Sequence, residues 1–302
     1  MVERAYINDI AALTALRLEF LQEDCGELNE EVISKLAEAL PAYFEKNLKR
    51  LLCHIERDLN GGKNMELEKY RPYWTKDYLM GPNSLRVLQE LLEKNPCPLN
   101  ADSLILDLGS GTGLTSFALC METGAKVLAN DLWISGEENA ARFAAWGVGD
   151  RITPVHENAD NLRFAPESFD AVVSIDSYHY FAGKEGYFQQ KILPFLKPGG
   201  VALFGVPGIR EEFDTQTETL LSPWLGEEAY MFHSPRQWRK ILGNHPDMEI
   251  VEVTELRCFE AAWQDWLTTE NEFAKADAVF WETIIKPCTN FVGMVIQKRS
   301  KS

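Results

Sequence analysis

The sequence predicts an α/β fold with a mostly parallel sheet, and three observations lead to this prediction. A short apolar run, Leu104–Leu108, has the pattern of a strand buried on both faces and breaks directly into a glycine-rich loop. A helical stretch follows at 114–121, and a second apolar run, 125–129, precedes Asp131. Short apolar runs and helical stretches then alternate to about residue 206. Such alternation is typical of parallel sheets.

Composition restricts the classes of protein to which the chain can belong. The 302 residues carry a formal net charge of −16, and 45% are hydrophobic, which is enough for a sizeable core. Nucleic-acid binding depends on clustered Lys and Arg, so we expect no nucleic-acid partner. No apolar stretch approaches the roughly 18 residues of a membrane span, so we expect no membrane association and a cytoplasmic location. The six scattered cysteines have no metal-ligand spacing, so we expect free thiols and no metal.

Residues 1–60 predict a helical N-terminal extension. Apolar residues recur at near-helical spacing over 8–23 and 29–52, and paired glycines within 60–64 indicate a linker. A short apolar segment followed by Asn-Asp-Ile at 8–10 resembles the N-terminal helices of the GNAT acetyltransferases. The loop that holds coenzyme A in those enzymes has no counterpart here, so we assign no acetyl transfer. We expect the extension to dock on the rest of the chain or to form a homodimer.

The loop after the first predicted strand indicates a nucleotide-like ligand. Gly109, Gly111 and Gly113 are spaced two residues apart, and Asp107 stands before them. Glycines let a backbone pass close to a ligand, while an acidic residue after the second strand, Asp131, can accept the hydroxyls of a ribose. A dinucleotide fingerprint would need a glycine at its sixth position, which this loop lacks.

This loop and three later motifs resemble the class I S-adenosylmethionine-dependent methyltransferases, in particular those of ubiquinone and menaquinone biosynthesis. The later motifs are 157–164, the strand and turn of 168–181, and Leu-Lys-Pro-Gly-Gly at 196–200. Glu157 and Arg163 replace the Gly and Pro of the family pattern. The resemblance covers about 100–206, the predicted cofactor core. It implies a Rossmann-like sheet of seven strands, mostly parallel, whose antiparallel last strand inserts between the fifth and sixth.

The resemblance also implies S-adenosylmethionine as the cofactor and names the residues that hold it. Asp131 would accept the ribose hydroxyls, and Asn158 and Ala159 would bracket the adenine. The glycine-rich loop would carry the methionine part, with Asp107 holding the loop or reaching the methionine amine. The complete expected set is Asp107, Gly109, Ser110, Gly111, Gly113, Asp131, Leu132, Asn158, Ala159 and Ser174.

Candidates for catalysis follow the fourth predicted strand, because open α/β sheets bind ligands beyond the carboxyl ends of their strands. Asp176, Tyr178 and His179 stand there. Many related methyltransferases have a His at the place of His179, and the unperturbed pKa of His suits proton removal near neutral pH. Within a methyltransferase domain expected over 65–302, the segment 207–233 has little periodicity and is expected to shape the substrate pocket.

The expected function is methyl transfer from S-adenosylmethionine to an N, O, S or C atom of a small molecule. Two alternatives stay open: an enzyme similar to the cyclopropane fatty-acid synthases, acting on a lipid, and a non-catalytic regulatory protein that binds the cofactor. The acidic charge favours a cationic amine as acceptor, as do aromatic side chains that could cage a cation. These aromatic residues are Tyr73, Trp74, Tyr78, Trp224, Trp263 and Trp266.

Overall fold

The computed structural model of the protein describes residues 65–212 and 214–300. It also describes a few helical residues nearer the N-terminus, at 14, 15, 18, 33–35, 37, 38, 40 and 41. The chain divides into two units between Lys63 and Asn64, and the second unit contains the sheet and the helices around it. The remaining residues of the expected N-terminal extension, its linker and its homodimer contact lie outside the described residues.

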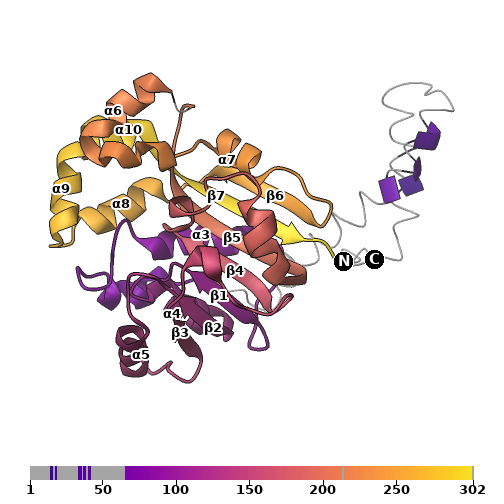
Figure 1. Ribbon diagram of the computed structural model, residues 1–302, viewed down its shortest axis with the longest axis horizontal. Coiled ribbons are helices and arrows are strands. Elements are labelled where there is room, and N and C mark those ends of the chain that lie inside the picture. Colours follow the sequence, from indigo (N-terminus) through magenta and orange to yellow (C-terminus); the bar gives the residue numbers. More distant parts are fainter. Residues whose placement is uncertain are drawn as a thin grey trace, which may run out of the picture. The chain divides into compact units, whose positions relative to one another are not determined.

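A seven-stranded sheet forms the centre of the second unit (Figure 1). Its strand order is β3-β2-β1-β4-β5-β7-β6, with the strands β1 to β5 parallel and β7 antiparallel to both of its neighbours. The predicted seven-stranded sheet, with its last strand inserted between the fifth and sixth, is therefore confirmed. The strands are β1 Leu104–Leu108, β2 Lys126–Asn130, β3 Ile152–Val155, β4 Phe169–Ile175, β5 Leu196–Ile209, β6 Met248–Glu255 and β7 Thr289–Lys298.

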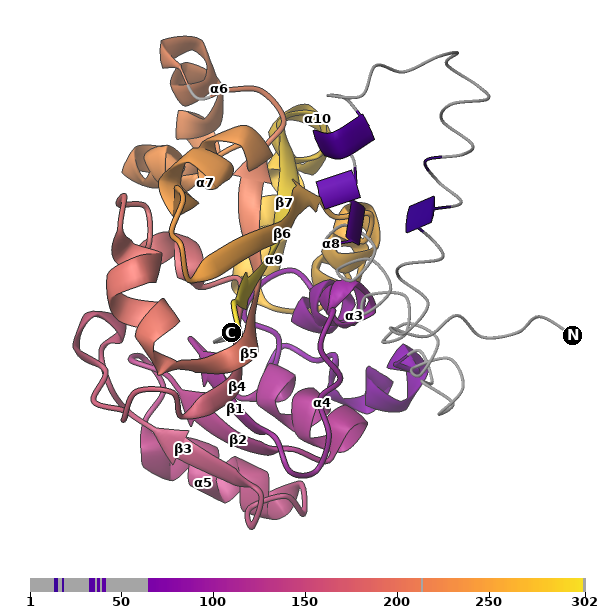
Figure 2. The ribbon, with the colours of Figure 1, turned by 90° about the vertical axis from the view of Figure 1, so that its right-hand side faces the viewer.

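Helices cover both faces of the sheet, and each face has its own apolar core (Figure 2). Side chains of α3, α4, α5 and α8 pack on one face, and those of α7 and of the chain between β4 and β5 pack on the other. This two-sided cover explains why β1 and β4 have nearly continuous apolar sequences. The helices are α3 Ser84–Lys94, α4 Leu114–Thr123, α5 Gly136–Ala145, α6 Thr215–Leu225, α7 Pro235–Leu242, α8 Phe259–Leu267, α9 Glu272–Phe280 and α10 Lys286–Cys288.

Short helical turns connect several of these elements. The 3₁₀ turns are Leu67–Tyr73, Ala159–Asn161, Tyr178–Tyr180, Leu193–Phe195 and Gly226–Met231, and the π-helical turns are Phe188–Ile192 and Trp281–Ile285. Pro194 lies inside one of these turns, directly ahead of β5. The Leu-Lys-Pro-Gly-Gly motif of 196–200 forms the first residues of β5 itself.

No helix among the described residues is long and apolar enough to cross a membrane.

Candidate active site

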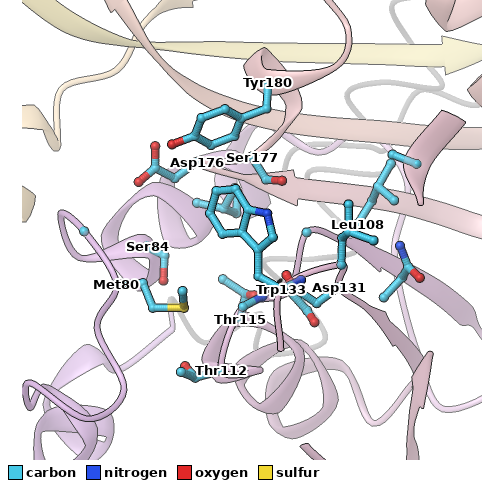
Figure 3. A pocket seen from close by; sticks show the side chains of 18 of the residues that line it. Met80, Ser84, Leu108, Thr112, Thr115, Asp131, Trp133, Asp176, Ser177 and Tyr180 are labelled. Atoms are coloured by element: carbon cyan, nitrogen blue, oxygen red, sulfur yellow. Dashed lines mark hydrogen bonds between the residues drawn. The ribbon is translucent and has the colours of Figure 1, made fainter. Parts of the chain in front are cut away.

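A cavity of about 360 Å³ opens at the carboxyl ends of β1, β2 and β4 (Figure 3). This is the edge of an open α/β sheet where ligands bind, and the volume lies in the range of small-molecule sites. Its walls come from the loop of 78–84, the glycine-rich turn after β1, the end of β2, the segment after β3 and the segment after β4.

The glycine-rich turn passes so close to the end of β4 that a side chain would not fit at its first glycine. Gly109 has φ +77°, and a Cβ there would lie 1.8 Å from the Ser177 Oγ. The Gly109 and Ser110 backbone N–H groups both donate to the carbonyl of Asn130, at 2.8 and 2.9 Å, which ties the turn to β2. The backbone of the turn is thus exposed to the cavity and fixed in place.

Asp107 supports this turn from beneath and does not reach the cavity. Its carboxylate is fully buried and accepts hydrogen bonds from Thr115 Oγ1 at 2.7 Å and Ser116 Oγ at 2.6 Å. Burial raises the pKa of Asp107 to about 6, although the two hydroxyls oppose the shift. Of the two expected roles, the geometry gives Asp107 that of joining β1 to the first turn of α4. It does not give Asp107 contact with a ligand.

Asp131 lies at the cavity wall directly after β2, with both carboxylate oxygens bound by backbone amides. Oδ2 accepts from Gly111 N at 2.8 Å, and Oδ1 accepts from Trp133 N at 2.7 Å and Ile134 N at 2.8 Å. These bonds hold the carboxylate rigidly between the glycine-rich turn and the end of β2. A carboxylate oxygen has more than one acceptor site, so Oδ1 and Oδ2 can still accept hydroxyls from a ligand.

The segment after β3 forms another wall of the cavity, at Asn158 and Ala159. Asn158 caps a short 3₁₀ turn by accepting from Asp160 N at 2.8 Å, and the Ala159 carbonyl accepts from Tyr187 Oη at 2.9 Å. Asn130 ties this segment to β2 through two bonds with the backbone of Glu157, at 3.0 and 3.1 Å. Hydrogen bonds within the protein therefore position the two expected adenine contacts.

Asp176 lines the cavity in an unusual backbone conformation. Its φ is +55°, which is uncommon for a residue other than glycine and occurs more often at functional sites. The Asp176 N–H donates to the Gly205 carbonyl at 2.7 Å, and this bond fixes the residue at the end of β4. Burial, and to a smaller extent the charge of Asp277, raises the pKa of the Asp176 carboxyl to about 7.

The comparisons with known proteins agree with this geometry. A family model described as a methyltransferase domain matches residues 105–200. A sterol 24-C-methyltransferase of Aspergillus fumigatus is 30% identical over 185 residues, which are 59% of this chain and 44% of that protein. A demethylmenaquinone methyltransferase of Clavibacter sepedonicus is 39% identical over 101 residues, 33% of this chain and 39% of that protein. The chain thus spans less than half the length of these curated relatives.

Solved structures share the fold at low sequence identity. A geranyl diphosphate methyltransferase in complex with S-adenosylmethionine superposes with a TM-score of 0.55 at 15% identity, over 71% of this chain and 85% of that one. A methyltransferase from Geobacter sulfurreducens in complex with S-adenosylhomocysteine gives 0.54 at 17% identity, over 73% and 94%. Together with the strand order, these structures show that the sheet has the fold of the class I S-adenosylmethionine-dependent methyltransferases. Within it, residues 105–200 match a methyltransferase domain.

The cavity gathers many, but not all, of the residues that the motifs predicted. The residues of the predicted set that line the cavity are Gly109, Ser110, Gly111, Asp131, Leu132, Asn158, Ala159 and Asp176. Gly113 and Ser174 lie beside it with structural contacts. Gly113 starts α4 next to the ring of Phe143, and the Ser174 hydroxyl donates to the Leu108 carbonyl at 2.6 Å.

Two of the three predicted catalytic residues do not reach the cavity. Tyr178 is buried in the core, where its ring stacks on Phe204 with centroids 4.0 Å apart. His179 is also buried, close to Phe232, and burial together with His233 lowers its pKa to about 3. The reason is the 3₁₀ turn after β4, which points both side chains into the protein. Of the three predicted catalytic residues, Asp176 thus lines the cavity, and Tyr178 and His179 do not.

Sequence reasoning missed several residues that line the cavity. Met80, Trp133, Ser177 and Tyr180 have no counterpart in the expected set. A signal for Trp133 exists in the sequence, because a large apolar side chain two residues after Asp131 stands beside a ligand site. The segment 207–233 was expected to shape the pocket, but none of its described residues lines it.

Proposed function

We propose that this protein transfers a methyl group from S-adenosylmethionine to a small-molecule acceptor. The observation that carries the proposal is the rigid set of backbone and carboxylate groups around the cavity. The glycine-rich turn, Asp131 and Asn158 stand on three separate strand ends and face one space. Ser110 adds a buried Oγ that borders the cavity and has no hydrogen-bond partner among the residues that the structure describes, as expected of a group that binds a ligand.

The residues fit this cofactor, and each would have its own task. Asp131 would bind the ribose hydroxyls, Asn158 and Ala159 would bind the adenine, and Gly109 to Gly111 would admit the methionine part. When bound, S-adenosylmethionine supplies an electrophilic methyl carbon: an acceptor lone pair bonds to it while the carbon–sulfur electron pair stays on sulfur. The chain itself contributes position, since holding two reactants in line supplies much of such a rate enhancement.

Calorimetric titration with S-adenosylhomocysteine tests the cofactor assignment. We expect binding by the wild type, and Asp131→Ala should weaken it by about 10- to 100-fold, because hydrogen bonds to charged groups contribute about 1.5–3 kcal/mol. Asp150→Ala is the matched control, since it removes an exposed carboxylate outside the cavity. Absence of binding at millimolar ligand, or equal affinities of the two variants, would refute the assignment.

A further inference from the structure

The charges that line the cavity are all of one sign. Among its lining residues, which belong to the described part of the chain, there is no Lys, Arg or His. Four carboxylates line it instead, from Asp131, Glu157, Asp160 and Asp176. An acceptor that carries a phosphate or carboxylate would find no cationic side chain here to pair with. The lining thus offers no cationic partner to the phosphates of a prenyl diphosphate or to the carboxylate of an amino-acid acceptor.

Asp176 is the one of these carboxylates that lies apart from the expected nucleoside contacts. Its Oδ2 faces the loop before α3, where a Cβ at Gly81 would come within 2.8 Å of it. The neighbouring Ser177 lies against Gly109, so Asp176 is next to the turn expected to hold the methionine part. Within the described part of the chain, the Asp176 carboxylate has no hydrogen-bond or ion-pair partner, so its acceptor sites are available to a ligand.

Aromatic rings stand at the same end of the cavity. Trp133, from the end of β2, and Tyr180, from the turn after β4, meet edge to face with centroids 5.4 Å apart. Both are exposed, Trp133 by 67% and Tyr180 by 43%, which is unusual for large aromatic side chains. Figure 3 shows the indole of Trp133 pointing toward Tyr180 and Asp176. A carboxylate beside exposed aromatic faces is the arrangement that binds organic ammonium groups.

We propose that the methyl acceptor is an amine without phosphate or carboxylate groups, which Asp176 binds through its nitrogen and which Trp133 and Tyr180 cover. This proposal rests on the proposed function, because it places the amine beside the methyl donor. Asp176 also has a task in the reaction. An amine enters as its ammonium form, and the ionised Asp176 carboxylate takes one N–H proton, which frees the nitrogen lone pair and leaves a neutral carboxylic acid. That proton passes to water when the product leaves.

Binding of sinefungin tests the place of Asp176 without any knowledge of the acceptor. This inhibitor carries a protonated amine where S-adenosylmethionine carries its methyl group, while S-adenosylhomocysteine carries nothing there. We expect the wild type to bind sinefungin more tightly than S-adenosylhomocysteine. The ratio of these two affinities should fall about 10-fold in Asp176→Asn. Asp160→Asn is the matched control, because it removes a carboxylate from another wall of the same cavity and should leave the ratio unchanged.

The result separates this proposal from the assignment of the cofactor. Failure of S-adenosylhomocysteine to bind refutes the proposed function. If S-adenosylhomocysteine binds normally but Asp176→Asn leaves the affinity ratio of sinefungin to S-adenosylhomocysteine unchanged, only the contact of Asp176 with the acceptor nitrogen is refuted. Trp133→Ala provides a second variant, and its effect on the ratio should be smaller than that of Asp176→Asn.

A matched set of probes tests the acceptor class on the protein saturated with S-adenosylhomocysteine. The set compares phenethylamine and other small amines with the corresponding alcohols, with phenylalanine, and with geranyl diphosphate, and thermal shifts report binding. The same set incubated with S-adenosylmethionine reports turnover as release of S-adenosylhomocysteine. We expect responses among the amines only, and Asp176→Asn should abolish them. Binding or turnover of the diphosphate, the amino acid or the alcohols in preference to the amines would overturn the proposal.

Discussion

At the scale of single residues, Asp176 shows what the sequence does and does not reveal. Its place after a buried strand predicted contact with the ligand, and the cavity contains it. Its neighbours Tyr178 and His179 had the same prediction and lie in the core instead. The difference is set by a 3₁₀ turn of three residues, in which each side chain points about a third of a circle from the one before it. A motif contains no information about that direction.

The raised pKa of the Asp176 carboxyl predicts how the reaction rate depends on pH. With a pKa raised to about 7 by burial and by Asp277, Asp176 is ionised only above that pH. We expect kcat/KM to rise as pH increases through about 7, once an amine substrate is in hand. Asp277 from α9 is a charged group that acts on it, while the pKa of Tyr180 is raised by burial and, to a smaller extent, by Asp176 itself. A profile of Asp176→Asn that keeps the same ascending limb would contradict this role.

Stability should respond to Asp176 in the opposite sense to activity. Because the folded-state pKa lies above the unfolded value of 3.8, ionisation of this carboxyl costs stability, and the cost grows from about pH 4 until it levels off above pH 7. Asn cannot ionise and tolerates positive φ. Asp176→Asn should therefore raise the Tm at pH 8, with a smaller increase at pH 5 and almost none near pH 3.5. Differential scanning calorimetry across this range would detect it, with Asp160→Asn as the control.

At the scale of elements, the sequence predicted which elements exist better than where they end. The apolar residues of 260–281 predict one helix, but α8 and α9 form there instead, and the break has a local cause. Thr268 and Thr269 donate from their hydroxyls to carbonyls at the end of α8, and Asn271 accepts from Phe273 N at 2.9 Å, which starts α9. Apolar periodicity alone does not reveal such side-chain caps. The cofactor turn, by contrast, was predicted in detail because few residues other than glycine fit its backbone.

That turn should not tolerate a side chain at Gly109. Gly109→Ala should abolish detectable binding of S-adenosylhomocysteine, because the new Cβ would meet the Ser177 side chain at 1.8 to 2.3 Å. Adding Ser177→Gly removes both of these atoms and should restore much of the affinity, with a remaining cost of about 1 kcal/mol for Ala at positive φ. Calorimetry on the single and double variants would measure this. A double variant no better than Gly109→Ala would show that backbone strain, and not the contact, decides.

A single carboxylate joins three helices beside the active site. Asp277 of α9 accepts from Trp224 Nε1 of α6 and Trp266 Nε1 of α8, both at 2.8 Å. Asp277→Ala leaves two indole donors without a partner and should lower the free energy of unfolding by about 2–4 kcal/mol. It also removes a negative charge near Asp176, so the ascending limb of the pH profile should move to lower pH. Denaturant titration and the pH profile measure these two effects separately. Asp265→Ala, in the neighbouring helix α8, cannot replace Asp277→Ala in this experiment, because Asp265 forms an ion pair with Arg86 instead.

At the scale of the whole molecule, the strand order was predictable and the distribution of charge was not. Motifs at four places along the chain determine a known sheet, whereas cationic side chains come together only on folding. Despite the net charge of −16, a second open cavity between α7 and the edge strand β6 has five residues of basic type in its lining. Four of them lie within residues 236–245, and the fold adds Arg299 from just after β7: Arg236, Arg239, Lys240, His245 and Arg299.

The place of β7 between β5 and β6 has a consequence for synthesis of the protein. In the described sheet β6 pairs only with β7, yet β6 leaves the ribosome about 34 residues before β7 begins, the count running from Glu255 to Thr289. Until β7 arrives, β5 presents an unpaired edge, and β6 has no partner at all. Unpaired strand edges on a nascent chain are sites of aggregation. A ribosome that pauses within this interval would therefore expose an aggregation-prone intermediate, to which chaperones would have to bind.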